Sequence, residues 1–384
     1  MSSHPDTLHP GTIWYAQEGV DNDVVLSTRI RLARNLANFV FPCQCSADDV
    51  QRIQSLVFSA FQKVPNPDCF QQVGVDQLDF SARQLLVERG ILPERSYTER
   101  NINNPDAELL RTFECVPGVV VRTDGRLSCL VNGRDHVSIS SFSAGYNPGE
   151  SWHLCREIDQ ILQQSLQFAA SYDFGFLTSN LKDAGSGMKA SVRLFLPGLM
   201  QTQQVQQMME QVSRQNCILE PVFGNTSVPY AALGACYQLC SLYASSGGED
   251  QQLGEFDMVV SSLCASERQA RSNYAETRPT MLRHIISRMF SVMRYSRFIE
   301  CSEALDIICS LHFGISMGLI MGVTYRELHA LMYRVRNTHL DYLYRDGGLD
   351  FTFEADVVEH KPLVISRLRA LLLQEALEKV QICL

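Results

Sequence analysis

The sequence predicts an α+β protein in which a sheet-containing N-terminal part precedes an almost wholly helical C-terminal part. Up to about residue 245, short apolar runs with strand-like alternation are interspersed with amphipathic helical stretches, whereas the rest of the chain has helical spacing. The chain has 384 residues, of which 45% are hydrophobic and 20% charged. This length suits two or three domains, and the composition is that of an ordinary globular protein.

Two segments of the N-terminal part have the alternation of β-strands. Residues 24–32 alternate between two faces, so that Arg29 and Arg31 lie on the same face. Residues 191–196 alternate in the same way and end at Pro197. We therefore expect two strands that present side chains on opposite faces of one sheet.

Capping residues mark the beginning of two helices. Ser46 is followed by Asp49, and Ser81 is followed by Gln84. A serine at such a position accepts a hydrogen bond from a backbone N–H of the first turn. The other expected N-terminal elements are a hairpin of residues 119–121 and 127–131 and helices over residues 154–166 and 201–215. The expected C-terminal helices cover residues 258–272, 281–298, 303–313 and 325–344.

Bulk charge and hydropathy exclude several classes of protein. The formal net charge of −9 leaves no basic excess to neutralise phosphates, so we expect no nucleic acid partner. The first ten residues lack the charged head and apolar stretch of a signal peptide, and no apolar run reaches the roughly 18 residues of a membrane span. We therefore expect a cytoplasmic protein that does not associate with a membrane.

The 13 cysteines do not form a metal-binding pattern. No CxxC pair exists, and the most closely spaced cysteines are Cys43 with Cys45 and Cys236 with Cys240. An odd number of cysteines in a chain of this length fits reduced thiols. Because Cys236 and Cys240 have helical spacing in an apolar run, we expect core packing there and no metal site.

Four stretches, in this order along the chain, carry a resemblance to a known family. They are residues 25–36 (VLSTRIRLARNL), 131–139 (VNGRDHVSI), 175–192 (GFLTSNLKDAGSGMKASV) and 232–239 (ALGACYQL). They resemble the arginine-bearing strand, the Asn-Glu-Glu-Asp-His strand, the glycine-rich loop and the domain-closing helix of the ATP:guanido phosphotransferases, or phosphagen kinases. Residues 313–320 (FGISMGLI), in the helical half, resemble the bacterial protein-arginine kinases.

The resemblance implies a fold and a chemistry. The implied fold is a phosphagen-kinase-like catalytic domain, an antiparallel sheet flanked by helices, over residues 1–245. An all-helical dimerisation or regulatory domain would follow over residues 246–384. The implied chemistry is transfer of a phosphoryl group from ATP to a guanidinium, for which the family uses phosphate-binding arginines, a carboxylate base and a cysteine thiolate.

The family's phosphate-binding arginines are only partly retained. Arg29 and Arg31 are present, and Lys189 replaces a third arginine with a point charge. Two further arginine positions hold Ser138 and Glu220. The resemblance therefore implies a residual phosphate or anion site in which the cluster has lost two cations and gained a carboxylate.

The catalytic base and the thiol are both replaced. The two glutamates of the Asn-Glu-Glu-Asp-His pattern are Gly133 and Arg134, and Asn180 stands where the family has its reactive cysteine. Asp135 and His136 remain, and we count His136 with the residual anion site. Asp135 faces the other side of the strand from its neighbours, so it is poorly placed to act as base. A speculative alternative is that Arg134 fills the guanidinium pocket as a built-in pseudosubstrate.

The phosphoarginine-reading motif of the bacterial enzymes, Arg-Asp-x-x-Arg-Ala, is also degenerate. Its best match is residues 355–360, where Ala355 and Glu359 replace the two arginines. Asp356 is retained, and we expect it to cap a helix. The apolar side chains of residues 286–293 fit either core packing or a dimer contact.

Three functional hypotheses remain open. The first is a catalytically impaired homologue, a pseudokinase that acts as a binding or regulatory protein. Its partner would be a zinc-binding adaptor-like protein or a paralogous kinase, it would form a homodimer, and it would need no cofactor. The second is an active ATP-dependent protein-arginine kinase. The third is a nucleotide or anion sensor without turnover, which would bind magnesium-ATP weakly.

Overall fold

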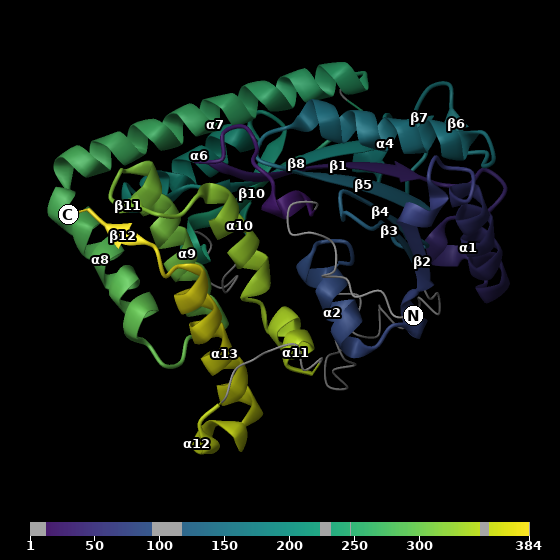
Figure 1. Ribbon diagram of the computed structural model, residues 1–384. Coiled ribbons are helices and arrows are strands. Elements are labelled where there is room, and N and C mark those ends of the chain that lie inside the picture. The colour runs from purple at the N-terminus through teal and green to yellow at the C-terminus, as the bar shows by residue number, and fades with distance from the viewer. Residues whose placement is uncertain (1–12, 94–116, 223–231, 246, 346–352, 384) are drawn as a thin grey trace.

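The computed structural model describes residues 13–93, 117–222, 232–245, 247–345 and 353–383, and its centre is an eight-stranded antiparallel sheet (Figure 1). In spatial order the strands are β2 (Phe70–Gly74), β3 (Gly118–Arg122), β4 (Leu127–Val131), β5 (Val137–Ala144), β1 (Val25–Arg34), β8 (Met188–Phe195), β10 (Cys236–Ser241) and β9 (Cys217–Pro221). Short two-stranded sheets pair β6 (Ala170–Ser171) with β7 (Gly175–Phe176) and β11 (Ile320–Met321) with β12 (Gln381–Ile382). The predicted α+β class is confirmed.

Helices cover both faces of the sheet. Those of the N-terminal part are α1 (Ala47–Phe61), α2 (Phe80–Glu88), α4 (Pro148–Gln163), α5 (Pro197–Gln201) and α6 (Val205–Ser213). Those of the C-terminal part are α7 (Glu249–Thr277), α8 (Pro279–Tyr295), α9 (Cys301–Ser316), α10 (Tyr325–Arg334), α11 (Asn337–Arg345), α12 (Ala355–Val358) and α13 (Lys361–Ala376). In Figure 1, α4 and α7 lie above the sheet, and α2, α10 and α11 lie below it.

The two faces of β1 differ in character because its side chains alternate. Ile30 and Leu32 are fully buried on the face that packs against α4, where the Cys155 thiol donates to the backbone oxygen of Ile30 at 3.4 Å. Arg29 and Arg31 therefore point to the opposite face, as the sequence predicts. On this second face the short 3-10 helix η1 (Trp14–Ala16) contacts β5 and α10.

The predicted helix starts are confirmed in one case and wrong in the other. The Ser46 hydroxyl accepts a hydrogen bond from the backbone N–H of Asp49 at 3.2 Å and caps α1. Helix α2 begins two residues earlier than predicted, because the Asp79 carboxylate, not Ser81, caps it by accepting from the Ala82 N–H at 2.7 Å. An aspartate is as good an N-cap as a serine, so an upstream cap competes on equal terms.

Residues 232–239 do not form the predicted helix. They comprise the 3-10 helix η7 (Leu233–Ala235) and the beginning of β10, which lies between β8 and β9. Tyr237 and Leu239 are fully buried on one face of β10, which is the two-residue period of a strand. Cys236 and Cys240 are therefore strand residues, and their four-residue spacing does not reflect a helical turn.

A buried ion pair joins α7 to the end of the sheet. The Glu267 carboxylate accepts hydrogen bonds from the backbone N–H groups of Gly198 and Leu199, at 2.8 and 2.9 Å, and from Arg271 Nε at 2.6 Å. Arg271 in turn donates to the backbone oxygens of Asp23 and Phe195. Glu267 thus satisfies the free N–H groups at the start of α5 and holds α7 against β8.

Two buried histidines lie in the contact between the helical half and the sheet. The Nε2 atoms of His312 in α9 and His329 in α10 are 3.3 Å apart, and His312 Nε2 also lies 3.0 Å from the Asn22 carbonyl oxygen. The His312 ring packs edge-on against Phe195. Burial lowers the pKa of His329 to about 4 and holds the pKa of His312 well below its ordinary value, with the charges of His329 and Arg271 lowering it further. Both rings are therefore neutral near pH 7.

Replacing Glu267 tests the joint between the helical half and the sheet. Glu267→Ala should lower the free energy of unfolding by about 3–5 kcal/mol, because Arg271 and two backbone donors lose their acceptor. Urea-induced unfolding measures this change. Arg268→Ala in the same helix is the matched control, since Arg268 is 44% exposed where it binds Asp21 and Asp23 and should contribute about 1 kcal/mol or less. Equal losses for the two variants would contradict this account.

The buried histidine pair predicts a loss of stability in mild acid. A histidine whose pKa is lower in the folded protein than in the unfolded chain stabilises the fold above pH about 6.5, and this stability is lost as pH falls. Between pH 7 and pH 5, His329 alone should account for about 2 kcal/mol of the decrease in unfolding free energy. Urea unfolding at the two pH values should therefore give a smaller decrease for His329→Gln than for the wild type. A decrease of the same size in the variant would show that His329 does not titrate with unfolding.

Candidate functional site

Four cationic side chains share one face of the central strands. In the antiparallel register of β1 and β8, Arg31 is opposite Lys189 and Ser27 is opposite Arg193. Because side chains alternate along a strand, Arg29, Arg31, Lys189 and Arg193 all point to the face turned away from α4. The structure therefore brings together the three cations predicted from the sequence and adds Arg193. The period-two spacing from Lys189 to Arg193 in β8 was the signal for this fourth cation.

A buried carboxylate pairs with two of these cations. Asp183 ends the 3-10 helix η6 (Leu181–Asp183), and its side chain is 0% exposed. Its Oδ2 accepts from Arg31 Nη2 at 2.8 Å, and its Oδ1 lies 2.6 Å from Lys189 Nζ. Asp183 thus bridges Arg31 and Lys189, with one carboxylate oxygen on each cation. Sequence reasoning missed this role because only the fold brings η6 over β1 and β8.

Arg29 lacks such a carboxylate partner among the described residues. Its Nη2 donates to the Ser140 hydroxyl at 3.0 Å, its guanidinium lies 5.2 Å from the centre of the Phe142 ring, and its Nε is buried with no hydrogen-bond partner. Burial, together with the positive charges of Arg31 and Arg193, lowers the pKa of Arg29 to about 10. Arg29 is therefore a desolvated cation beside like charges.

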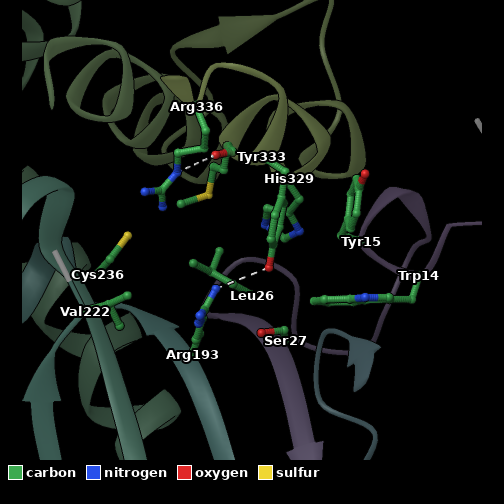
Figure 2. A pocket seen from close by; sticks show the side chains of 11 residues that line it. Trp14, Tyr15, Leu26, Ser27, Arg193, Val222, Cys236, His329, Tyr333 and Arg336 are labelled. Carbon is green, nitrogen blue, oxygen red and sulfur yellow. Dashed lines mark hydrogen bonds between the residues drawn. The ribbon is translucent and has the colours of Figure 1, made fainter. Parts of the chain in front are cut away.

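Aromatic residues from distant parts of the chain close over this face. Tyr333 of α10 accepts a hydrogen bond from Arg193 Nη1 at 3.3 Å, and Trp14 stacks on Phe142 with ring centres 5.6 Å apart. Figure 2 shows Arg193 extending from the sheet to the Tyr333 hydroxyl, with Trp14 beside them. Two cavities of about 20 Å³ each remain here, and Arg193 and Tyr333 line both of them. Cys236 lines the first cavity, and Arg29 lines the second.

Each cavity has room for about one water molecule. Ligand pockets for molecules of drug size are on the order of 300–1,000 Å³. In this conformation, a nucleotide would have to displace the aromatic side chains to reach Arg29 and Arg193. Neither Trp14 nor Tyr333 belongs to a motif that singles it out in the sequence, so sequence reasoning missed them.

The position of the family's base is occupied by an exposed arginine. Arg134 lies between β4 and β5 and is exposed to solvent, so its position gives no support to the pseudosubstrate alternative. The neighbouring Asp135 is buried, and its Oδ1 accepts from Asn35 Nδ2 at 2.8 Å and from the Ser179 N–H at 2.7 Å. The Asn35 side chain and the backbone at Ser179 therefore hold the Asp135 carboxylate in place, which is a structural role.

Asn180, which stands at the position of the family's thiol, supports the loop that carries Asp183. Asn180 is the N-cap of η6, and its Oδ1 accepts a hydrogen bond from the Lys182 N–H at 3.3 Å. Its Nδ2 is 3.4 Å from Asp183 Oδ1. An amide can make both contacts, whereas a cysteine at this position would offer only a weak donor and a weak acceptor.

The remaining predicted positions contribute no cation. His136 is fully buried; its Nδ1 accepts from the Leu36 N–H at 3.0 Å, and its Nε2 lies 3.4 Å from Cys45 Sγ. Burial lowers the pKa of His136, so the ring is neutral. Ser138 is half-buried on β5, and Glu220 is exposed on β9. Of the positions predicted from the sequence, only those on β1 and β8 thus bring positive charge to the site, and Arg89 and Arg336 also line its cavities.

The C-terminal segment predicted to match the phosphoarginine motif forms the short helix α12. Glu354 is the N-cap residue of this helix, and Asp356 lies in its first turn, so the predicted capping role of Asp356 is wrong. Glu354 pairs with Arg367 at 3.2 Å. In α13, Arg369 is 1% exposed and donates to the backbone oxygens of Val335 and Ile299, both at 2.7 Å. These arginines are engaged within the fold.

Neither a metal centre nor a membrane span is found in the described parts of the chain. There, no group of three or more His, Cys, Asp or Glu side chains is placed to hold a metal ion. No described helix is long and apolar enough to cross a membrane.

Two family models match consecutive parts of the chain. The model of the ATP:guanido phosphotransferase C-terminal catalytic domain matches residues 52–270, and that of the protein-arginine kinase McsB C-terminal domain matches residues 279–381. A protein-arginine kinase of Brevibacillus brevis is 27% identical over 98% of this chain and 100% of its own length. One of Moorella thermoacetica is 28% identical over 94% of this chain and 99% of its own.

Solved structures support the fold. A lombricine kinase superposes with a TM-score of 0.55 and 14% identity, covering 68% of this chain and 70% of its own. The duplicated taurocyamine kinase of Schistosoma mansoni, with bound transition-state analogue components, superposes with a TM-score of 0.56 and 18% identity, covering 73% of this chain and 41% of its own. These similarities confirm the predicted phosphagen-kinase-like fold.

Proposed function

Since the chain belongs to the ATP:guanido phosphotransferase family, we propose that it is a catalytically impaired protein-arginine-kinase homologue that acts as a binding or regulatory protein. The observation that carries this proposal is Asp183, a buried carboxylate that already binds Arg31 and Lys189. A phosphate that used the same two cations would have to displace it. Two of the cations are therefore already paired within the protein where the family binds its nucleotide.

The energetic consequence of Asp183 can be estimated. A hydrogen bond to a charged group contributes about 1.5–3 kcal/mol, so the loss of two such contacts amounts to about 3–6 kcal/mol. Every 1.4 kcal/mol changes an affinity about tenfold. The pairing of Arg31 and Lys189 with Asp183 alone thus predicts a reduction in ATP affinity of about a hundredfold to ten-thousandfold. The loss of arginine at Ser138 and Glu220 acts in the same direction.

Replacement of the base and the thiol impairs the chemical step separately. General-base catalysis contributes about a hundredfold to ten-thousandfold to rate. Arg134 has the wrong charge for a base, and Asp135 is held by Asn35 and the Ser179 N–H. Asn180 cannot supply the negative charge of a thiolate. Binding and chemistry are thus impaired by independent changes.

Two alternatives rest on specific observations. Full-length similarity to proteins named protein-arginine kinase fits an active protein-arginine kinase equally well. Such an enzyme would have to release Arg31 and Lys189 from Asp183. The lack of a carboxylate partner for Arg29 among the described residues, and its position beside Arg193, favour an anion or nucleotide sensor without turnover. The impaired homologue should not bind magnesium-ATP at practical concentrations, whereas both alternatives should bind it. Turnover then distinguishes the active kinase from the sensor.

The proposal extends to partners and location. By family resemblance, we infer a homodimer and a protein partner, either a zinc-binding adaptor-like protein or a paralogous kinase. Within α8, Ile286 and Met293 are buried in the core and Met289 and Phe290 pack against it, so this stripe supplies little of a dimer surface. A cytoplasmic location is supported by the thiol-rich composition.

Calorimetric titration with magnesium-ATP tests the role of Asp183. The wild type should give no heat of binding at high micromolar nucleotide, whereas Asp183→Asn should bind at least tenfold more tightly, because Arg31 and Lys189 become available. Asp173→Asn, an exposed aspartate in the β6–β7 turn, is the control with the same change of charge. Tight binding by the wild type, unchanged in Asp183→Asn, would show that Asp183 does not compete with phosphate.

A phosphoarginine assay tests the chemical step. With magnesium-ATP and an arginine-rich protein, the wild type should form no phosphoarginine above background, as detected by ³¹P NMR or mass spectrometry. The combined variant Arg134→Glu, Ser138→Arg, Asn180→Cys and Asp183→Asn should gain activity, because it restores base, phosphate ligand and thiol and frees the cations. Turnover by the wild type would support the active-kinase alternative instead.

A further inference from the structure

Two cysteines from the two halves of the chain meet in the core. Cys236 is the first residue of β10 and is 1% exposed, whereas Cys309 lies in the middle of α9 and is 4% exposed. Their Sγ atoms are 3.6 Å apart although the residues are separated by 73 positions. We propose that peroxide converts this pair into a disulfide that links the catalytic sheet to the helical half.

The geometry requires only a small movement. A disulfide has an S–S distance of about 2.05 Å, so the sulfur atoms must approach each other by about 1.5 Å. Gly234 permits this close packing of η7 against α9: a Cβ atom at Gly234 would lie 2.7 Å from Cys309 Sγ. Gly234 also has a φ of 64°, which a residue with a side chain rarely adopts. The glycine therefore allows the two sulfur atoms to meet.

A small oxidant has a route to one of the thiols. Cys236 lines the cavity of about 20 Å³ between the sheet and α10, together with Arg193, Tyr333 and Arg336. In Figure 2 the Cys236 sulfur points into this space on the side of Arg336. The cavity has room for about one water-sized molecule. Hydrogen peroxide is of nearly that size, whereas a glutathione disulfide is far too large to enter.

The reaction balances with peroxide as oxidant. The Cys236 thiolate attacks one peroxide oxygen, the O–O bond breaks, and hydroxide leaves and takes up the thiol proton as water. The Cys309 sulfur then attacks the sulfenic sulfur of Cys236, an S–S bond forms, and a second water leaves with the Cys309 proton. Two thiols are oxidised and one peroxide is reduced to two waters.

The environment makes this oxidation slow and selective. The hydrogen bond with the adjacent Cys236 thiol, together with burial, raises the pKa of Cys309, while the positive charge of Arg336 acts in the opposite direction. A thiol that is mostly protonated is a slow nucleophile, so the closing attack of Cys309 on the oxidised Cys236 is slow. The exposed cysteines Cys43 and Cys69 are reached more easily but have no sulfur neighbour among the recorded contacts of the described residues.

A peptide map after peroxide treatment tests the proposal. Exposed thiols of the folded protein are first alkylated; the protein is then treated with hydrogen peroxide and digested with chymotrypsin without reductant. The expected product is a cross-linked peptide pair that contains Cys236 and Cys309. The cross-link should raise Tm by about 5 °C, because a long loop is closed in the unfolded chain, and reductant should reverse the rise.

Variants and a second oxidant give the controls. Cys309→Ala should lose both the cross-link and the rise in Tm, and Cys43→Ser, which changes an exposed cysteine, should keep both. Glutathione disulfide should give no cross-link in the folded protein. The proposal is overturned if the wild-type map returns Cys236 and Cys309 as free thiols, or returns Cys236 as a sulfinic acid without a cross-link. A cross-link formed as rapidly by glutathione disulfide as by peroxide would overturn the proposed route. Peptide mapping of the wild type decides even if Cys309→Ala does not fold.

Discussion

The arrangement of the whole molecule depends on one buried carboxylate, Glu267. The Glu267 carboxylate binds the first N–H groups of α5 and the Arg271 side chain. Arg271 in turn donates to the backbone oxygens of Asp23, before β1, and of Phe195, at the end of β8. Three partners compensate the cost of burying this charge. The joint fixes α7, and thereby helps to set where α9 and α10 pack. The contacts of Tyr333 with Arg193 and of Cys309 with Cys236 both depend on that placement.

The site itself is organised by an imbalance of charge. Four cations on neighbouring strands repel one another, and such repulsion directly across a sheet is destabilising. Asp183 reduces the repulsion between Arg31 and Lys189, but the recorded hydrogen-bond partner of Arg29 and of Arg193 is only a hydroxyl group in each case. The pKa of Arg29 is lowered because the side chain is desolvated and because the positive charges of Arg31 and Arg193 repel it. One half of the cation cluster is thus paired with Asp183, and the other half is covered by aromatic rings.

Features that are decided within a few residues could be predicted from the sequence, whereas features that depend on contacts between distant segments could not. Strand alternation placed Arg29 and Arg31 on one face, and the Ser46 cap was identified, because both are decided within a few residues. Residues 232–239 were predicted as helix from the resemblance to the family's domain-closing helix, whereas pairing with β8 and β9 decides the strand. Asp183 lies within the resembling stretch 175–192 but was not singled out, because its two partners lie on strands that the fold alone brings beneath it.

The choice between an impaired and an active protein depends on Asp183 more than on the aromatic cover. Aromatic contacts contribute about 0.5–1.5 kcal/mol each beyond burial, and the hydrogen bond between Arg193 and Tyr333 is 3.3 Å long. A cover held by such contacts can open, as lids over active sites do. Opening it would expose Arg29 and Arg193 but would leave Arg31 and Lys189 bound to Asp183. The carboxylate moves with the same domain as the cations, so a nucleotide would encounter it in either conformation. The weakening of phosphate binding that we propose for Asp183 is therefore independent of whether the cover is open or closed.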